Sequence, residues 1–139
     1  MAMTHLVFAE IFEKFPTLKI ITHHCGGMTP LFGERIVVLY NTALERLGGK
    51  VFPGLTKHPV EYYKMFYGDT ALNGNTWGLM NGYHFFGEDR LVFASDMPYD
   101  VQNGAVVIRQ TVQSIERMDI PESSKKKIYE GNARRLLHL

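Results

Sequence analysis

The sequence predicts an α/β fold in which short parallel strands alternate with helices. Three short apolar segments, at residues 18–24, 65–69 and 90–96, are each followed by a segment whose apolar side chains have helical spacing. Strands that alternate with helices favour right-handed crossovers and therefore a parallel sheet. The 139 residues are 45% apolar and contain no repeat or low-complexity stretch, so a single domain over residues 1–139 is the simplest organisation.

The first third of the chain contains two predicted helices separated by a strand. Residues 3–14 place apolar side chains at helical spacing and end before Pro16, which indicates an amphipathic helix. Residues 18–24 are short, apolar and β-branched and lead into a pair of glycines, as expected of a strand buried on both faces. A helix is predicted to follow at about 33–47.

The rest of the chain continues the alternation. Pro59 and Pro121 each stand where the first turn of a helix is expected, and the apolar segment before Met97 is the most convincing strand. The predicted elements are an irregular stretch at 48–55, a short helix at 59–64, a strand at 65–69, a helix at about 75–85, a strand at 90–96, and helices at about 102–118 and 122–137.

Composition excludes several classes of function. Fifteen basic and fourteen acidic residues give a formal charge of +1, which provides no broad surface for nucleic acid or anionic lipid. Cys25 is the one cysteine, so neither an intrachain disulfide nor a four-cysteine metal cluster is possible. No apolar run approaches the ~20 residues that span a bilayer, and Met1–Glu13 has no secretory-signal pattern. We therefore expect a soluble, cytoplasmic protein.

Ionisable side chains end all three predicted strands, at His24, Asp69 and Asp96. In a parallel sheet flanked by helices, functional groups collect at the carboxyl ends of the strands. Side chains alternate across a strand, so His24 is expected on the face of Thr22, and His23 on the opposite face as a packing residue. If these faces line a barrel interior, His24, Asp69 and Asp96 converge at one rim.

Each of these residues also has a structural alternative. An aspartate before a helix commonly caps it or braces a turn, and His24 can equally hydrogen-bond a loop. Imidazole and carboxylate suit a divalent metal, but catalytic zinc takes about three protein ligands, and the sequence has no HxH or HExxH motif. A Cys25–His24 nucleophile is disfavoured because adjacent strand residues point apart, so Cys25 is expected to be a small filler. The remaining histidines are expected to be surface or packing residues: His5, His58, His84 and His138.

Four segments occur in a characteristic order along the chain. They are Phe15–Gly27 (FPTLKIITHHCGG), Phe66–Ala71 (FYGDTA), Leu91–Pro98 (LVFASDMP) and Gly131–Leu137 (GNARRLL). In this order they closely resemble the carboxyl-terminal part of the metal-dependent hydrolases of the amidohydrolase-2 family. This family includes aminocarboxymuconate-semialdehyde decarboxylase and the resorcylate-type decarboxylases. The resemblance extends over essentially the whole chain.

The resemblance implies a (β/α)8 TIM barrel of which this chain supplies about strands 6 to 8 with flanking helices. Asp96 then matches the metal-ligating aspartate of the eighth strand. His24, just ahead of the glycines, matches the catalytic histidine that activates the metal-bound water or moves a proton at the substrate. Asp69 is expected to contact substrate or to brace His24. The implied cofactor is a divalent metal, zinc first, with manganese or magnesium as alternatives.

The chain departs from the family pattern because it has no counterpart of the first five strands, which carry three of the four metal ligands. We therefore expect a truncated gene product or a piece of a longer protein, in which the metal can be absent. Strands without neighbours and an apolar inner face without its opposite wall favour self-association, so a homo-oligomer is predicted.

Two functions remain open from the sequence. The first is the carboxyl-terminal portion of a metal-dependent hydrolase or decarboxylase that acts on small carboxylated substrates, aromatic or ring-cleaved. The second is a catalytically silent, self-associating domain in which His24 and Asp96 are remnants. The divalent metal content of the purified chain distinguishes the two.

Overall fold

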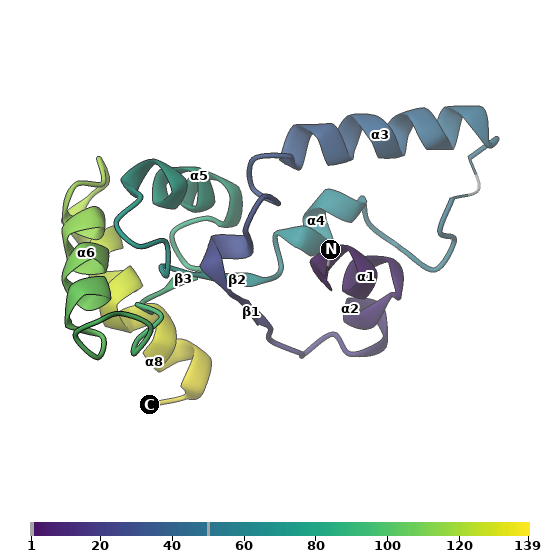
Figure 1. Cartoon of the computed structure of the whole chain (residues 1–139). Helices are drawn as coiled ribbons and strands as arrows, with labels where there is room; N and C mark the ends of the chain where they lie inside the picture. The colour runs from purple at the N-terminus through teal and green to yellow at the C-terminus, as the bar shows by residue number, and fades with distance from the viewer. Residues whose placement is uncertain (1, 50) are drawn as a thin grey trace.

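Three short parallel strands form a sheet in the order β1, β2, β3, with helices packed around it (Figure 1). The structure is a computed structural model that describes residues 2–49 and 51–139; Met1 and Lys50, the latter inside the irregular stretch predicted at 48–55, lie outside the described residues. The strands are β1 (Ile21–Thr22), β2 (Tyr67–Asp69) and β3 (Leu91–Val92). The predicted α/β class and the parallel pairing are therefore confirmed.

The helical elements follow the predicted order along the chain. They are α1 (Ala2–Phe8), α2 (Ile11–Lys14), the 3-10 turn η1 (His24–Gly26), α3 (Gly33–Arg46), α4 (Pro59–Tyr63), α5 (Thr76–Phe86), α6 (Ala105–Glu116), α7 (Glu122–Lys126), the π-helical segment η2 (Lys127–Gly131) and α8 (Asn132–Leu137). None of the helices within the described part of the chain combines the length and the apolar character needed to cross a bilayer.

The strands at the two edges of the sheet are shorter than the sequence predicts. β1 ends because the chain turns into η1 at His24. On the side of β2, β3 ends because the hydroxyl of Thr70 accepts the N–H of Ala94 at 3.0 Å and donates to the carbonyl of Ala94 at 2.9 Å, in place of a backbone partner. On the other side, the backbone N–H of Phe93 donates to the carbonyl of Ile128 on η2 at 3.0 Å.

The helix predicted at 3–14 is divided into α1 and α2. Glu10 lies between them with φ 61°, in the left-handed region. The two halves pack against different partners: Phe8 lies against Phe52 with ring centroids 4.3 Å apart, and Phe12 meets Phe66 edge-on at 4.9 Å. The change of direction lets one short segment place both rings against aromatic partners, which outweighs helical continuity.

The core extends from α1, α2 and α4 across the sheet to α5, α6 and η2. Figure 1 shows α6 and α8 beyond β3, α1, α2 and α4 on the other side of the strands, and α3 extending as an arm above α4. The core includes four side chains with no exposed surface, from α5, β3, α6 and η2: Leu79, Leu91, Ile115 and Ile128. Packing of these side chains against the strands holds the strand ends in position.

Gly82 on α5 allows the helix to approach the turn after β1. A Cβ atom at this position would lie 2.1 Å from the Sγ atom of Cys25, which is 2% exposed and cannot move into solvent. The absence of a side chain at Gly82 is therefore what lets α5 and η1 pack together.

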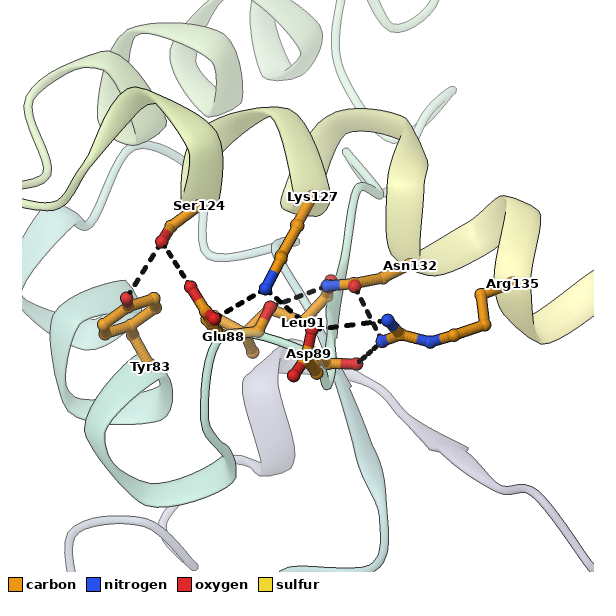
Figure 2. A network of polar contacts seen from close by, with 8 residues as sticks. All are labelled: Tyr83, Glu88, Asp89, Leu91, Ser124, Lys127, Asn132 and Arg135. Carbon is orange, nitrogen blue, oxygen red and sulfur yellow. Dashed lines mark hydrogen bonds and ion pairs between the residues drawn. The ribbon is translucent and has the colours of Figure 1, made fainter.

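A network of polar contacts joins the carboxyl-terminal helices to the turn that precedes β3 (Figure 2). The Lys127 Nζ atom lies 2.5 Å from Oε1 of Glu88 and 3.1 Å from Oδ1 of Asp89. The buried Asn132 side chain donates to the carbonyls of Glu88 at 2.8 Å and Leu91 at 2.7 Å. The network thereby fixes where β3 begins.

We predict that Gly82→Ala lowers the free energy of unfolding by about 1 to 3 kcal/mol, because the added methyl group overpacks against the Cys25 thiol. Gly131→Ala is the matched control, since Gly131 has helical φ and ψ of −61° and −41° and its Cβ would meet no atom closer than 3.8 Å. The control should leave stability unchanged or raise it by up to about 1 kcal/mol. Urea titration measures both; equal effects of the two substitutions would contradict the packing argument.

We also predict that the contribution of Lys127 to stability decreases in acid. Hydrogen bonding to Lys127 lowers the pKa of both Glu88 and Asp89. A carboxyl group whose pKa is lower in the folded state contributes stability above its unfolded pKa, about 4, and loses it as the pH falls through the folded pKa.

The test compares the unfolding free energies of the wild type and Lys127→Met at pH 6 and at pH 3. The difference between the two proteins should shrink at pH 3. Lys126→Met, at an exposed neighbouring position, should show a small difference that does not depend on pH. A Lys127→Met effect of the same size at both pH values would rule out the carboxylates as its cause.

Candidate functional site

Residues 24–27 form a left-handed turn directly after β1. The φ angles are 51° at His24, 52° at Cys25, 75° at Gly26 and 59° at Gly27. The two glycines adopt this region without strain, but His24 and Cys25 pay a conformational cost there. Because β1 ends at Thr22, the alternation that assigned His24 to the face of Thr22 does not extend to it, and that part of the prediction is wrong.

A hollow of about 480 Å³ lies at the carboxyl ends of the strands. It brings together two of the three predicted site residues, Asp69 and Asp96, and a third ionisable group that the sequence analysis placed elsewhere, His23. Its lining residues are Ile21, His23, Asp69, Ala71, Val92, Phe93, Ala94, Asp96 and Met97. An apolar groove of about 470 Å³ under α3 lies away from these strand ends.

The expectation that His23 packs against a helix or loop is also wrong. Its side chain is 87% exposed, and its Nδ1 atom lies 3.5 Å from Oδ2 of Asp69. The physical reason is the early end of β1, which leaves His23 as an extended residue at the start of the turn. A signal was present in the sequence: the glycine pair after Cys25 marks a turn whose beginning was placed two residues too late.

Asp69 braces the turn. Its side chain is 3% exposed, and its Oδ1 atom accepts the backbone N–H groups of Cys25 and Ala71, both at 3.1 Å. The bond to Cys25 offsets the conformational cost of the left-handed backbone, and the bond to Ala71 holds the loop after β2 beside the same carboxylate. Only Oδ2 remains for other partners. The bracing role is thus visible, whereas a contact between Asp69 and substrate stays a prediction.

His24 is exposed and has one ring nitrogen held by the protein. Its Nδ1 atom lies 2.9 Å from the carbonyl oxygen of Ala71. A carbonyl only accepts hydrogen bonds, so Nδ1 carries a proton and Nε2 is left to meet a ligand. The rings of His23 and His24 have centroids 6.2 Å apart, although His24 itself does not border the hollow.

Asp96 follows β3 with φ 65° and borders the hollow. The alternative that Asp69 and Asp96 cap the next helices is not what the structure contains. Asn75 caps α5 by accepting the N–H of Gly78 at 2.9 Å. Asp100 caps α6 by accepting the N–H groups of Val106 and Val107 at 3.0 Å, and these and neighbouring backbone donors lower the pKa of Asp100. Other residues therefore cap both helices.

The described residues do not by themselves form a metal centre. Among residues 2–49 and 51–139, no three histidine, cysteine, aspartate or glutamate side chains are arranged to hold a metal ion. Asp96 offers one carboxylate ligand, whereas catalytic zinc takes about three protein ligands. Any metal bound by Asp96 needs further ligands from outside this part of the chain.

Cys25 is the filler that the sequence predicts. Its thiol is 2% exposed, and burial, with a smaller contribution from the charge of Asp69, raises its pKa to about 12. The reactive thiolate is therefore scarce at neutral pH, which excludes Cys25 as an activated nucleophile in this arrangement.

Comparison with known proteins identifies related sequences and structures. The amidohydrolase family profile matches residues 1–139. The chain is 28% identical to 6-methylsalicylic acid decarboxylase of Penicillium expansum over 95% of this chain, and 31% identical to gamma-resorcylate decarboxylase of Polaromonas sp. over 96% of it. It spans about 38% of the length of both relatives.

A solved structure has the same arrangement of elements. The dihydroxybenzoic acid decarboxylase of Polaromonas sp. JS666, with bound manganese and the inhibitor 2-nitroresorcinol, superposes with a TM-score of 0.76 and 29% identity. The match covers 99% of this chain and 39% of that one. The three parallel strands and their helices therefore have the fold of part of a TIM barrel, as the sequence resemblance implied.

We predict that Asp69→Ala lowers the free energy of unfolding by about 2 to 4 kcal/mol, because it leaves the N–H groups of Cys25 and Ala71 without their acceptor. Asp119→Ala, at an exposed position, is the control and should change stability by less than about 0.5 kcal/mol. Thermal and urea unfolding measure both. An Asp69→Ala protein as stable as the control would show that the turn does not depend on this carboxylate.

Proposed function

Because this chain belongs to the amidohydrolase family, we propose that it supplies the carboxyl-terminal part of a metal-dependent decarboxylase site for small carboxylated aromatic compounds. The decarboxylase relatives and the Polaromonas structure support this substrate class. The observation that carries the proposal is the His24 ring, whose Nδ1 is held by the Ala71 carbonyl at 2.9 Å so that Nε2 is free at the strand ends.

His24 is the proposed general acid/base. In decarboxylation the bond between the ring carbon and the carboxyl group breaks, carbon dioxide leaves, and the ring carbon takes a proton. An imidazole changes its protonation near neutral pH, so His24 Nε2 suits the group that carries this proton. The carbonyl of Ala71 holds the ring through Nδ1, which leaves Nε2 for the proton transfer. Asp69 acts indirectly, since it holds the turn that bears His24.

Asp96 is the proposed metal ligand from this chain. A divalent ion would polarise an oxygen of the substrate, and manganese, bound in the Polaromonas structure, is a suitable ion for carboxylate ligands. Zinc and magnesium remain alternatives for this site. The other ligands belong to the part of the barrel that these residues do not include.

A catalytically silent, self-associating domain is the second candidate. It is supported by the single carboxylate that Asp96 offers to a metal and by the large apolar side chains left exposed, such as Trp77 at 85% and Val101 at 97%. Self-association, proposed for either function, would cover such surface. A cytoplasmic location also stays a prediction.

A hybrid enzyme tests the proposed function. Residues 2–139 replace the matching segment of the Polaromonas gamma-resorcylate decarboxylase, and release of carbon dioxide from γ-resorcylate is measured with Mn²⁺ present. We predict an active hybrid whose kcat falls by about 10²- to 10⁴-fold with His24→Gln. Asp96→Asn should reduce the Mn²⁺ content, measured by elemental analysis.

His84→Gln is the matched control, because His84 is an exposed histidine on α5, outside the hollow. It should leave kcat unchanged. A folded, manganese-loaded hybrid that keeps full activity with His24→Gln would remove His24 from the chemistry. A folded hybrid that takes up no manganese and releases no carbon dioxide would favour the silent domain.

A further inference from the structure

We infer that His23, positioned by Asp69, recognises the carboxylate group of the ligand that enters the hollow at the strand ends. The inference rests on the proposed function for the class of ligand, an aromatic carboxylate. It adds a binding residue that is distinct from the acid/base His24 and from the metal ligand Asp96.

The first step is the orientation of the ring. His23 Nδ1 lies 3.5 Å from Oδ2 of Asp69, within ion-pair distance, and because a carboxylate oxygen only accepts, Asp69 favours a proton on this nitrogen. Nε2 is the ring atom left to meet a ligand. With 87% of the side chain exposed, no part of the described chain covers the imidazole.

The second step is the charge of the hollow. Its lining contains two acidic side chains, Asp69 and Asp96, and neither Lys nor Arg among the described residues. A carboxylated ligand is repelled by both aspartates unless a donor stands between them and the ligand. His23 is the one lining side chain in the described part of the chain that can carry a positive charge and donate a hydrogen bond.

The third step is the supporting structure. Cys25 and Ala71 donate N–H groups to Oδ1 of Asp69 at 3.1 Å, so the carboxylate keeps its position, with Oδ2 at 3.5 Å from His23 Nδ1. The apolar part of the lining, including Val92 and Phe93, provides surface for an aromatic ring. One hollow therefore offers an apolar wall for the ring of the ligand and an imidazole for its carboxylate.

The test uses the full chain labelled with ¹⁵N and two probes that differ by the carboxylate, γ-resorcylate and resorcinol. On titration, γ-resorcylate should shift the side-chain ring resonances of His23, and resorcinol should not. His23→Ala should weaken binding of γ-resorcylate roughly tenfold or more, as expected for loss of a charge-assisted hydrogen bond. Binding of resorcinol should be unchanged, and His84→Gln, the control, should bind γ-resorcylate like the wild type.

A second variant separates the positioning role of Asp69 from its bracing role. Asp69→Asn keeps an oxygen acceptor for the two backbone N–H groups but replaces Oδ2 with an amide donor. The turn should stay folded, while the ¹⁵N shifts of His23 change tautomer and the affinity for γ-resorcylate falls. An unchanged His23 tautomer in a folded Asp69→Asn protein would overturn the role of Asp69.

Three results would overturn the assignment of His23: no carboxylate-dependent shift at its ring, equal binding of γ-resorcylate and resorcinol, or an affinity for γ-resorcylate within twofold of the wild type in His23→Ala. In the hybrid enzyme, His23→Ala should raise KM about tenfold with kcat little changed. Full activity of the hybrid with His24→Gln defeats the proposed function alone, because the His23 shifts in the full chain do not depend on catalysis.

Discussion

The buried carboxylate of Asp69 is the constraint on which the strand-end region depends. One oxygen accepts N–H groups from Cys25 and Ala71, which lie on different loops, and the other faces His23. Two successive non-glycine residues in the left-handed region cost on the order of 1 kcal/mol or more each. Charge-assisted hydrogen bonds to a buried group are strong enough to offset that cost. The same interactions place two imidazoles at the carboxyl end of the sheet.

The packing around this turn requires residues without side chains at two positions. α5 reaches Cys25 because Gly82 has no side chain, and a Cβ atom at Gly68 in β2 would lie about 3.0 Å from the Leu91 side chain. Asn75 and Asp100 cap the helices that follow β2 and β3. The carboxylates at the strand ends, Asp69 and Asp96, are therefore not used to cap these helices. Asp69 is available to brace the turn, and Asp96 to meet a ligand.

In the proposed function, the chain supplies one side of a barrel site. It places two imidazoles near a carboxylate but does not, over residues 2–49 and 51–139, gather three metal-binding side chains. The chain spans about 38% of the length of the decarboxylase relatives, which agrees with the incomplete set of metal ligands. The proton-handling and anion-recognising groups that we propose therefore belong to this portion. The metal, if bound, joins it to the remainder of the barrel.

The sequence by itself determined the α/β class, the order of elements and the candidates Asp69 and Asp96, because hydrophobic periodicity and the chemistry at strand ends are local properties. It could not place His23 and His24, since strand alternation applies only as far as the strand extends. The end of β1 is decided by the hydrogen bond between Cys25 and Asp69, which are 44 residues apart in the sequence, and by the contact of Cys25 with Gly82. Such long-range contacts arise only when the helices and strands assemble, and they decided which imidazole faces the hollow.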